Sequence, residues 1–290
     1  MANEHFAVSP DWRWYILLYF FLAGIAGGAY VIGALLRLTG ARDHAAERAA
    51  FLVAFPAIAV CPLLLTLDLG SPGRFWHMLV NTTPGGGGLI LRPESPMSVG
   101  VWALSLFSAF ALVSFLGALG RPVGVARLVA GRRGTALTVV GAVLGLFVAS
   151  YTGVLLSVSN EAVWSDTWTL GGLFLASGMS AAAVVVAVAA RRRSAAATER
   201  RLAEADGWFA LVELLFVVLL FLTLAAAGSA GTLLGHGWAL LWVVVALGVL
   251  APLLGLARRG NAGAMTAVAP VLVILGVLAL RAVIIFSPQV

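Results

Sequence analysis

The sequence has no lysine and little charge of either sign. Charged residues make up 10% of the 290 positions, and all 18 basic side chains are arginines, against 12 acidic ones. Without a lysine amine, the protein cannot form a Schiff base or a retinal linkage, nor supply the lysine of a phosphate-binding loop. The four successive glycines at 85–88 are therefore not expected to cradle a phosphate.

Cysteine is scarce, and histidine is absent from the apolar runs. Cys61 is the single cysteine, which excludes an internal disulfide, a Cys-ligated iron–sulfur cluster and a Cys-rich zinc site. The histidines fall in termini or connections, which leaves no pair of mid-helix imidazoles for a haem. They are His5, His44, His77 and His236. We expect no metal, haem or iron–sulfur cluster to be bound by this protein alone.

Apolar residues dominate what is present, at 61% of the sequence. One water-soluble core could not hide so much apolar surface, so the composition indicates an all-α integral membrane protein. Runs of about 20 apolar residues, enough to cross a bilayer as a helix, recur about eight times. They lie approximately at 14–36, 49–69, 98–119, 135–157, 167–190, 208–230, 238–256 and 264–286. The connections are mostly short, so a single polytopic membrane domain over 1–290 is expected.

The arginines are distributed unevenly between the two sides of the expected bundle. Most fall in the connections after the first, third, fifth and seventh helices. These are Arg37, Arg42, Arg48, Arg121, Arg127, Arg132, Arg133, Arg191, Arg192, Arg193, Arg200, Arg201, Arg258 and Arg259. The positive-inside rule places these connections in the cytoplasm and both termini on the non-cytoplasmic side. Arginines dispersed in this way form no soluble basic face, so no nucleic-acid partner is expected.

One connection, the outer segment 70–96, is much longer than the others. It contains FWHML, then PGGGG, then RPESP. Long loops in compact proteins often carry function, although a flexible surface loop is an equal alternative here.

Few polar side chains fall inside the expected helices, and these carry most of the information about function. The fourth and eighth helices run outward, which places Tyr151 ~9 Å and Arg281 ~7 Å from their outer ends. Asp68 closes the second helix at the same face, within expected reach of Arg281, and His77 follows in the outer segment. These four could bind a polar headgroup and pass protons. They could also form a structural ion pair with an interfacial aromatic belt.

Glu213 lies about five residues inside the cytoplasmic end of the expected sixth helix. A carboxyl at this depth could begin a proton path from the inner side. A residue so near a helix end can also snorkel to the surface, which the sequence favours here.

Three stretches resemble the NrfD/PsrC family, the membrane subunit of polysulfide-reductase-like complexes. They are WRWYILLYFFLAGIAGGAY in the first helix, LDLGSPGRFWHML with SPMSVGVW between the second and third, and YTGVLLSVSNEAVWSDTW across the fourth and fifth. Together they span roughly the first 180 residues, and their order and spacing carry the resemblance.

This resemblance implies a function. Members of the family bind a quinone, menaquinone or ubiquinone, near the outer face of a bacterial or archaeal cytoplasmic membrane. They exchange electrons with an extrinsic ferredoxin-like 4Fe–4S subunit that serves a molybdopterin-type catalytic subunit. By resemblance, Tyr151 contacts the quinone, and Asp68 and His77 serve as proton or headgroup ligands. The family also uses Asn and His near the start of its first helix, for which Asn3 and His5 are the candidates here.

A transporter or proton channel is the alternative, with the same buried polar residues lining its path. No clear inverted repeat is visible in the sequence. Co-purification with an iron–sulfur protein would favour the redox function, and solute movement by the isolated protein would favour transport.

Overall fold

The computed structural model describes residues 11–39, 43–82, 87–120, 123–191, 193–235, 237–257 and 268–289. Within these ranges the fold is helical, with eight helices long and apolar enough to cross a membrane. They are α1 (Trp14–Leu38), α2 (His44–Asp68), α3 (Pro96–Leu119), α5 (Gly131–Ser157), α6 (Leu170–Ala190), α7 (Ala196–Ala227), α9 (Trp238–Ala257) and α10 (Val268–Phe286). The expectation of an all-α protein with about eight membrane-spanning helices is thereby confirmed.

Four short helices complete the secondary structure of the described ranges. A 3-10 helix, η1 (Pro72–Met78), follows α2, and α4 (Val123–Leu128) connects α3 to α5. The others are α8 (Ala230–Leu234) and η2 (Ser287–Gln289). The outer segment is thus partly helical, and an isolated antiparallel bridge between Val80 and Leu89 joins its two arms. Its residues 83–86 lie outside the described ranges.

Several helix ends follow from local sequence chemistry. Asp43 caps α2 by accepting a hydrogen bond from the Ala46 N–H at 3.0 Å, and Ser95 caps α3 just before Pro96 at the first helical position. Both use a short polar side chain to satisfy an otherwise free backbone donor. Helices α3 and α7 end at Gly120 and Gly228, whose positive φ suits a left-handed cap.

The sequence-based boundaries differ most from the structure at the start of the sixth long helix. This helix, α7, begins at Ala196 rather than near residue 208. Its additional turns, AATERRLAEADG, are polar but rich in Ala, Glu and Arg, which favour helix. A search for apolar runs cannot detect such turns because it finds only the part of a helix that suits lipid.

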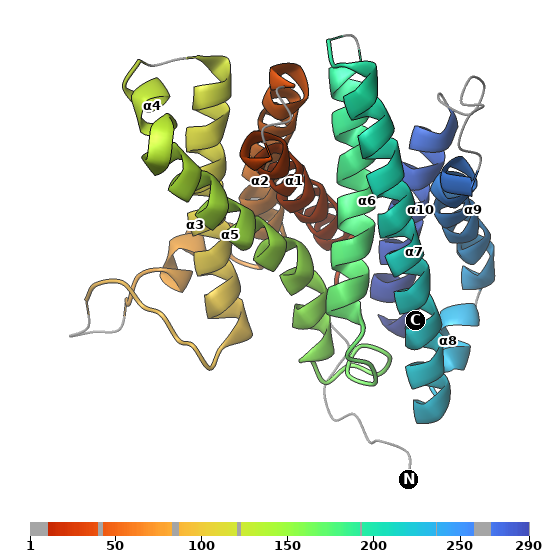
Figure 1. Cartoon of the computed structure of the whole chain (residues 1–290). Helices are drawn as coiled ribbons and strands as arrows, with labels where there is room; N and C mark the ends of the chain where they lie inside the picture. The colour runs from red at the N-terminus through yellow and green to blue at the C-terminus, as the bar shows by residue number, and fades with distance from the viewer. Residues whose placement is uncertain are drawn as a thin grey trace.

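Helix α1 lies at the centre of the bundle and packs against α2, α5 and α6 (Figure 1). Its small residues allow the close approach. The Gly24 and Gly28 pair faces Gly178 and Ala182 of α6, where added Cβ atoms would lie within 3.3 Å of neighbouring atoms. The GxxxG pattern of this helix therefore serves helix packing.

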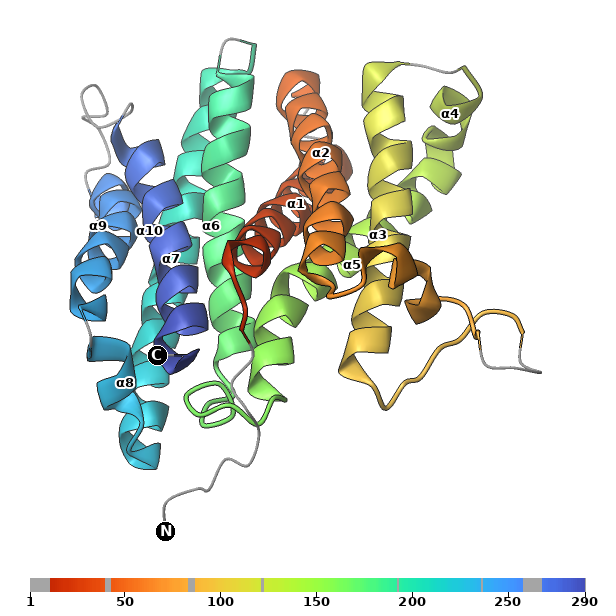
Figure 2. The ribbon, with the colours of Figure 1, turned by 180° about the vertical axis from the view of Figure 1, so that it is seen from behind.

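The two ends of the described structure meet at one end of the bundle. The Trp12 N–H donates to Oε1 of Gln289 at 2.7 Å. Figure 2 shows the end of α10 and the outer segment in its lower half, and the α3–α5 and α6–α7 connections at the upper end. The arrangement suits an even number of spans with both ends on one side. Which side of the membrane this is remains a prediction from the arginines.

Candidate functional site

Tyr151 lies near the end of α5 and reaches across to the first turn of α3. Its hydroxyl donates a hydrogen bond to the Pro96 carbonyl, and its ring stacks on Phe147 with centroids 5.4 Å apart. A Cβ atom at Gly100 would lie only 2.5 Å from the ring, so glycine leaves the space that Tyr151 fills. With 8% of its surface exposed, Tyr151 is an interior residue and not an interfacial anchor.

A second phenol, Tyr19 of α1, lies close to the first. It is buried and interacts electrostatically with Tyr151 and with Cys61 of α2. The Cys61 thiol also approaches the Tyr19 carbonyl at 3.8 Å. The two tyrosines thus bring α1 and α5 together near the end of the bundle where the Trp12–Gln289 hydrogen bond lies.

Sequence reasoning missed Tyr19, although the stretch that carries the family resemblance contains it. Helix α1 is apolar all round, so no polar face marks the inward side. Helical spacing does not single it out either, because every residue from Ala23 to Ala34 of this helix is also buried.

Asp68 ends α2 at the same end of the bundle but has other partners than expected. It is half-buried and interacts electrostatically with Arg13 and Asp11. Arg13 forms an ion pair with Asp11 at 2.6 Å, and this hydrogen-bonded carboxylate raises the pKa of Arg13. The expected Asp68–Arg281 pair is not among the ion pairs of the described residues. Asp68 therefore belongs to a charged group at the start of α1.

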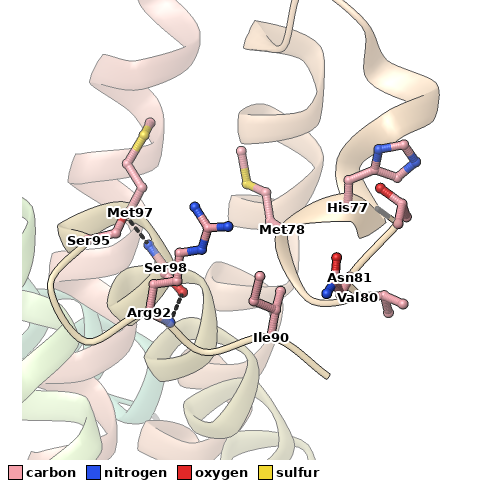
Figure 3. A pocket seen from close by; sticks show the side chains of 10 residues that line it. His77, Met78, Val80, Asn81, Ile90, Arg92, Ser95, Met97 and Ser98 are labelled. Atoms are coloured by element: carbon pink, nitrogen blue, oxygen red, sulfur yellow. Dashed lines mark hydrogen bonds between the residues drawn. The ribbon is translucent and has the colours of Figure 1, made fainter. Parts of the chain in front are cut away.

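His77 is exposed on η1, edge-on to Trp76 at 4.1 Å between ring centroids. It lines the rim of a cavity of about 310 Å³ between the outer segment and α3. Figure 3 shows Arg92 between Met78 and Met97, with His77 on the opposite rim. The cavity thus combines cationic and apolar walls.

Tyr151 is hydrogen-bonded to the start of α3, next to residues that line the cavity. Ser95 and Met97 line the cavity, and Pro96 between them accepts the Tyr151 hydrogen bond. The backbone N–H of Arg92 is fixed nearby by Ser98 Oγ at 3.0 Å (Figure 3). The Tyr151 hydroxyl is therefore bonded to a residue that lies between two cavity-lining residues, although Tyr151 itself is not part of the lining.

Arg281 of α10 turns away from this region into the centre of the bundle. It is fully buried and donates to Ser177 Oγ at 3.0 Å and to the Phe174 carbonyl at 3.1 Å. Its guanidinium also stands 4.9 Å from the Phe174 ring centroid. The expected role of Arg281 beside Asp68 is corrected by these contacts, because the guanidinium is held against α6 instead.

Glu213 is buried in the middle of α7 and interacts electrostatically with Arg281. It is 2% exposed, with Asp206 as its other electrostatic partner. A side chain enclosed to this degree inside the bundle does not snorkel to the surface. The favoured surface role was wrong for this reason. Asp206, two helical turns nearer the start of α7, was missed because the expected helix began after it.

The remaining predicted features concern metals and the N-terminus. Among the described residues no group of three or more His, Cys, Asp or Glu could hold a metal ion. Asn3 and His5 lie outside the described ranges.

Comparison with known proteins identifies the family. The profile of the family described as polysulphide reductase, NrfD, matches residues 3–290. A subunit of the polysulfide reductase of Wolinella succinogenes is 32% identical over 183 residues, which are 59% of the present sequence and 55% of that protein. Protein NrfD of Escherichia coli strain K12 is 29% identical over 181 residues, 59% of the present sequence and 56% of that protein. The match thus spans about half the length of these curated relatives. The chain belongs to the polysulphide reductase NrfD family of multi-pass membrane proteins.

Proposed function

We propose that this protein is the quinone-reactive membrane subunit of a respiratory oxidoreductase complex in a bacterial or archaeal cytoplasmic membrane. The main support is the position of Tyr151, Tyr19 and the His77 cavity at the same end of the bundle. A quinone headgroup needs hydrogen-bond donors at its carbonyl oxygens and apolar surface along its ring and tail. This region supplies both, and family membership supports the same class of function.

The Tyr151 hydroxyl is the donor best placed for a quinone carbonyl. It already donates to a carbonyl oxygen, that of Pro96, and a quinone oxygen is an acceptor of the same kind. Donation to the quinone would stabilise the negative charge that develops on that oxygen during reduction. His77 on the cavity rim would serve the other carbonyl.

Asp68 is the proposed proton acceptor for the outer aqueous phase. Oxidation of a quinol releases two electrons and two protons, and quinone reduction takes up the same number. Asp68 is half-buried at the end of α2 beside Arg13. A carboxylate held near a cation at the water boundary can take a proton from the site and release it to solvent.

The electrons require an acceptor outside this protein. Its relatives are named as part of polysulfide reductase or as NrfD. We infer an extrinsic 4Fe–4S ferredoxin-like protein as the partner, itself serving a molybdopterin-type catalytic subunit. The outer segment on both sides of the cavity is the proposed docking surface, since a cluster bound there would lie nearest Tyr151.

The test uses the purified complex and follows reduction of the iron–sulfur subunit by a quinol analogue. Tyr151→Phe is expected to slow this reaction by about tenfold or more, with assembly unchanged. Tyr30→Phe is the matched control, because Tyr30 is also a buried tyrosine, bonded to Ser114 at 2.8 Å and deeper in α1.

Two outcomes would count against the proposal. Equal rates for Tyr151→Phe and Tyr30→Phe would remove Tyr151 from the reaction. If the protein purified without any iron–sulfur partner and moved a solute in liposomes, the transporter alternative would replace the redox function.

A further inference from the structure

The connection from α3 to α5 carries arginines that have no acidic neighbour in the sequence. Arg127 lies in α4, and Arg132 and Arg133 lie in the first turn of α5. All three are exposed, and together they are termed the α4–α5 arginines. No Asp or Glu occurs anywhere from 95 to 160, a stretch that includes α3, α4 and α5. The charge of these three helices is therefore positive only.

Other arginines at the same end of the bundle do have acidic neighbours. Arg37 forms an ion pair with Glu47 at 3.8 Å, and Arg200 and Arg201 lie in α7 beside Glu199 of its first turn. None of the ion pairs within the described ranges includes the α4–α5 arginines. The positive-inside rule accounts for all of these arginines alike. It does not explain why one group of them lacks carboxylates.

The local fold holds the α4–α5 arginines close together. The Ala130 N–H donates to the Arg127 carbonyl at 3.4 Å, which closes a tight turn between α4 and α5. Like charges on such a turn repel one another, and arginines in the first turn of a helix also oppose the helix dipole. A bound anion would remove both costs. Guanidinium groups bind phosphate oxygens in bidentate pairs, so a phosphate group suits this cluster best.

An exposed apolar strip continues from the arginines along α5. Val139 and Val143 follow Arg132 by about two and three helical turns, so the three side chains lie on one face, which extends ~16 Å along the axis. Val139, Val140 and Val143 are 43%, 47% and 60% exposed. Helix α4 and the start of α5 lie at the edge of the bundle in both views (Figures 1 and 2). The strip is therefore open to an acyl chain that begins at the arginines.

We propose that the α4–α5 arginines and the valine strip of α5 bind an anionic phospholipid. Its phosphate group binds among the three guanidinium groups, and one acyl chain lies along Val139 and Val143. A zwitterionic phospholipid brings its own cation and would leave the repulsion between the arginines in place. A free phosphate ion shares the headgroup chemistry but covers no valine. This site lies at the opposite end of the bundle from the proposed quinone region and uses none of its residues.

The first test compares charge variants of the full-length protein, purified in detergent with any bound partner. Binding of phosphatidylglycerol is measured by native mass spectrometry. Arg132→Gln/Arg133→Gln should bind this lipid at least about tenfold more weakly than the wild type, because the bidentate pairs are lost. Arg200→Gln/Arg201→Gln is the matched control, since it removes the same charge from exposed arginines at the same end, and it should bind like the wild type. Equal affinity of the two variants for the lipid would overturn the proposal.

The second test uses the wild-type protein and distinguishes the lipid from other ligands. Phosphatidylcholine should bind at least about tenfold more weakly than phosphatidylglycerol, because it carries no net negative charge. Inorganic phosphate in large excess should not displace the bound phosphatidylglycerol. Displacement by inorganic phosphate would identify a site for a free anion, and equal binding of the two lipids would identify no anion site. Either result would refute the proposal.

A third measurement locates the acyl chain. Val139→Ser/Val143→Ser should weaken phosphatidylglycerol binding, because the chain loses apolar surface. Val212→Ser/Val218→Ser changes two exposed valines of α7 instead and should bind the lipid like the wild type. Equal binding by these two variants would contradict the position of the chain along α5. None of these measurements involves quinone, so the lipid site and the proposed function can fail independently.

Discussion

At the scale of single residues, the space around Tyr151 depends on one glycine. Gly100 lies opposite the Tyr151 ring, and a Cβ there would come within 2.5 Å of it. We predict that Gly100→Ala displaces the ring, breaks the hydrogen bond to Pro96 and lowers quinol-dependent turnover by about tenfold. The measurement is turnover of the assembled complex.

The control for this change is another helical glycine. Gly255 of α9 has open space around it, so Gly255→Ala should keep full turnover and slightly favour the helix. If Gly100→Ala also kept full turnover, the position of the Tyr151 ring would not matter for the reaction.

The residues of the candidate site were predictable to different degrees. Tyr151 was identified because a sequence motif marks it, and its burial could be expected from its depth. Tyr19 and Asp206 were missed because nothing local in an apolar helix, or in a polar helix start, shows which side chains point inward. Arg281 was correctly expected inside the last helix but was assigned the wrong partner. The position of a residue along a helix does not show towards which neighbouring helix its side chain points.

At the scale of helices, Asp43 joins two elements that are distant in sequence. Its carboxylate accepts from the Ala46 N–H of α2 at 3.0 Å and from the Ala195 N–H before α7 at 2.9 Å. Burial raises the pKa of Asp43, but hydrogen bonds, including one from Thr198, outweigh this and leave its pKa below the ordinary value. The ionised form is therefore the one that holds α2 to α7.

A pH dependence of stability follows from this lowered pKa. The contribution of Asp43 is fully present above the ordinary pKa of an unfolded aspartate, near 4, and is lost as the pH falls through the lower folded pKa. Asp43→Ala should reduce the free energy of unfolding by about 1 kcal/mol at neutral pH. The difference from wild type should shrink below about pH 4.

Denaturant titrations of the protein in detergent at several pH values would measure this difference. Ser95→Ala removes the uncharged cap of α3 and should show a difference that does not vary with pH. A constant difference for Asp43→Ala as well would mean that its carboxylate contributes only as an ordinary cap.

The packing of α1 against α6 and α10 gives a further prediction. A Cβ at Gly24 would lie 2.8 Å from a guanidinium nitrogen of Arg281 and 3.3 Å from the Cα of Gly178. Gly24→Ala should therefore destabilise the bundle by about 1–3 kcal/mol through overpacking. Thermal unfolding in detergent would show it, with Gly255→Ala unchanged. Wild-type stability in Gly24→Ala would mean that the three helices can separate without cost.

The helices themselves were largely predictable from the sequence, because eight apolar runs need lipid and only helices satisfy their backbone there. The start of α7 was not, since its first turns are polar and lie beyond the apolar run. The order of helices along the sequence also gives no indication that α1 is central. The available signal was the pair of small residues Gly24 and Gly28, whose spacing allows neighbouring helices to approach closely.

At the scale of the whole molecule, one end of the bundle carries the candidate quinone region and the other carries most of the arginines that the structure describes. The Trp12–Gln289 hydrogen bond joins the residues just before α1 to η2, which follows α10, at the same end as the quinone region. The orientation in the membrane therefore decides from which side an electron-transfer partner can dock. The positive-inside rule assigns the arginine-rich end to the cytoplasm.

Single-cysteine labelling can test this orientation in the intact protein. Cys61 is the only cysteine and is buried, so it should react little with a membrane-impermeant maleimide. A cysteine replacing the exposed Leu91 of the outer segment should be labelled in intact spheroplasts. One replacing the exposed Ala197 at the start of α7 should be labelled only after lysis. The reverse labelling pattern would show that the protein has the opposite orientation in the membrane, and it would place the proposed iron–sulfur partner in the cytoplasm. Labelling of both positions before lysis would show that the membrane does not separate the two ends.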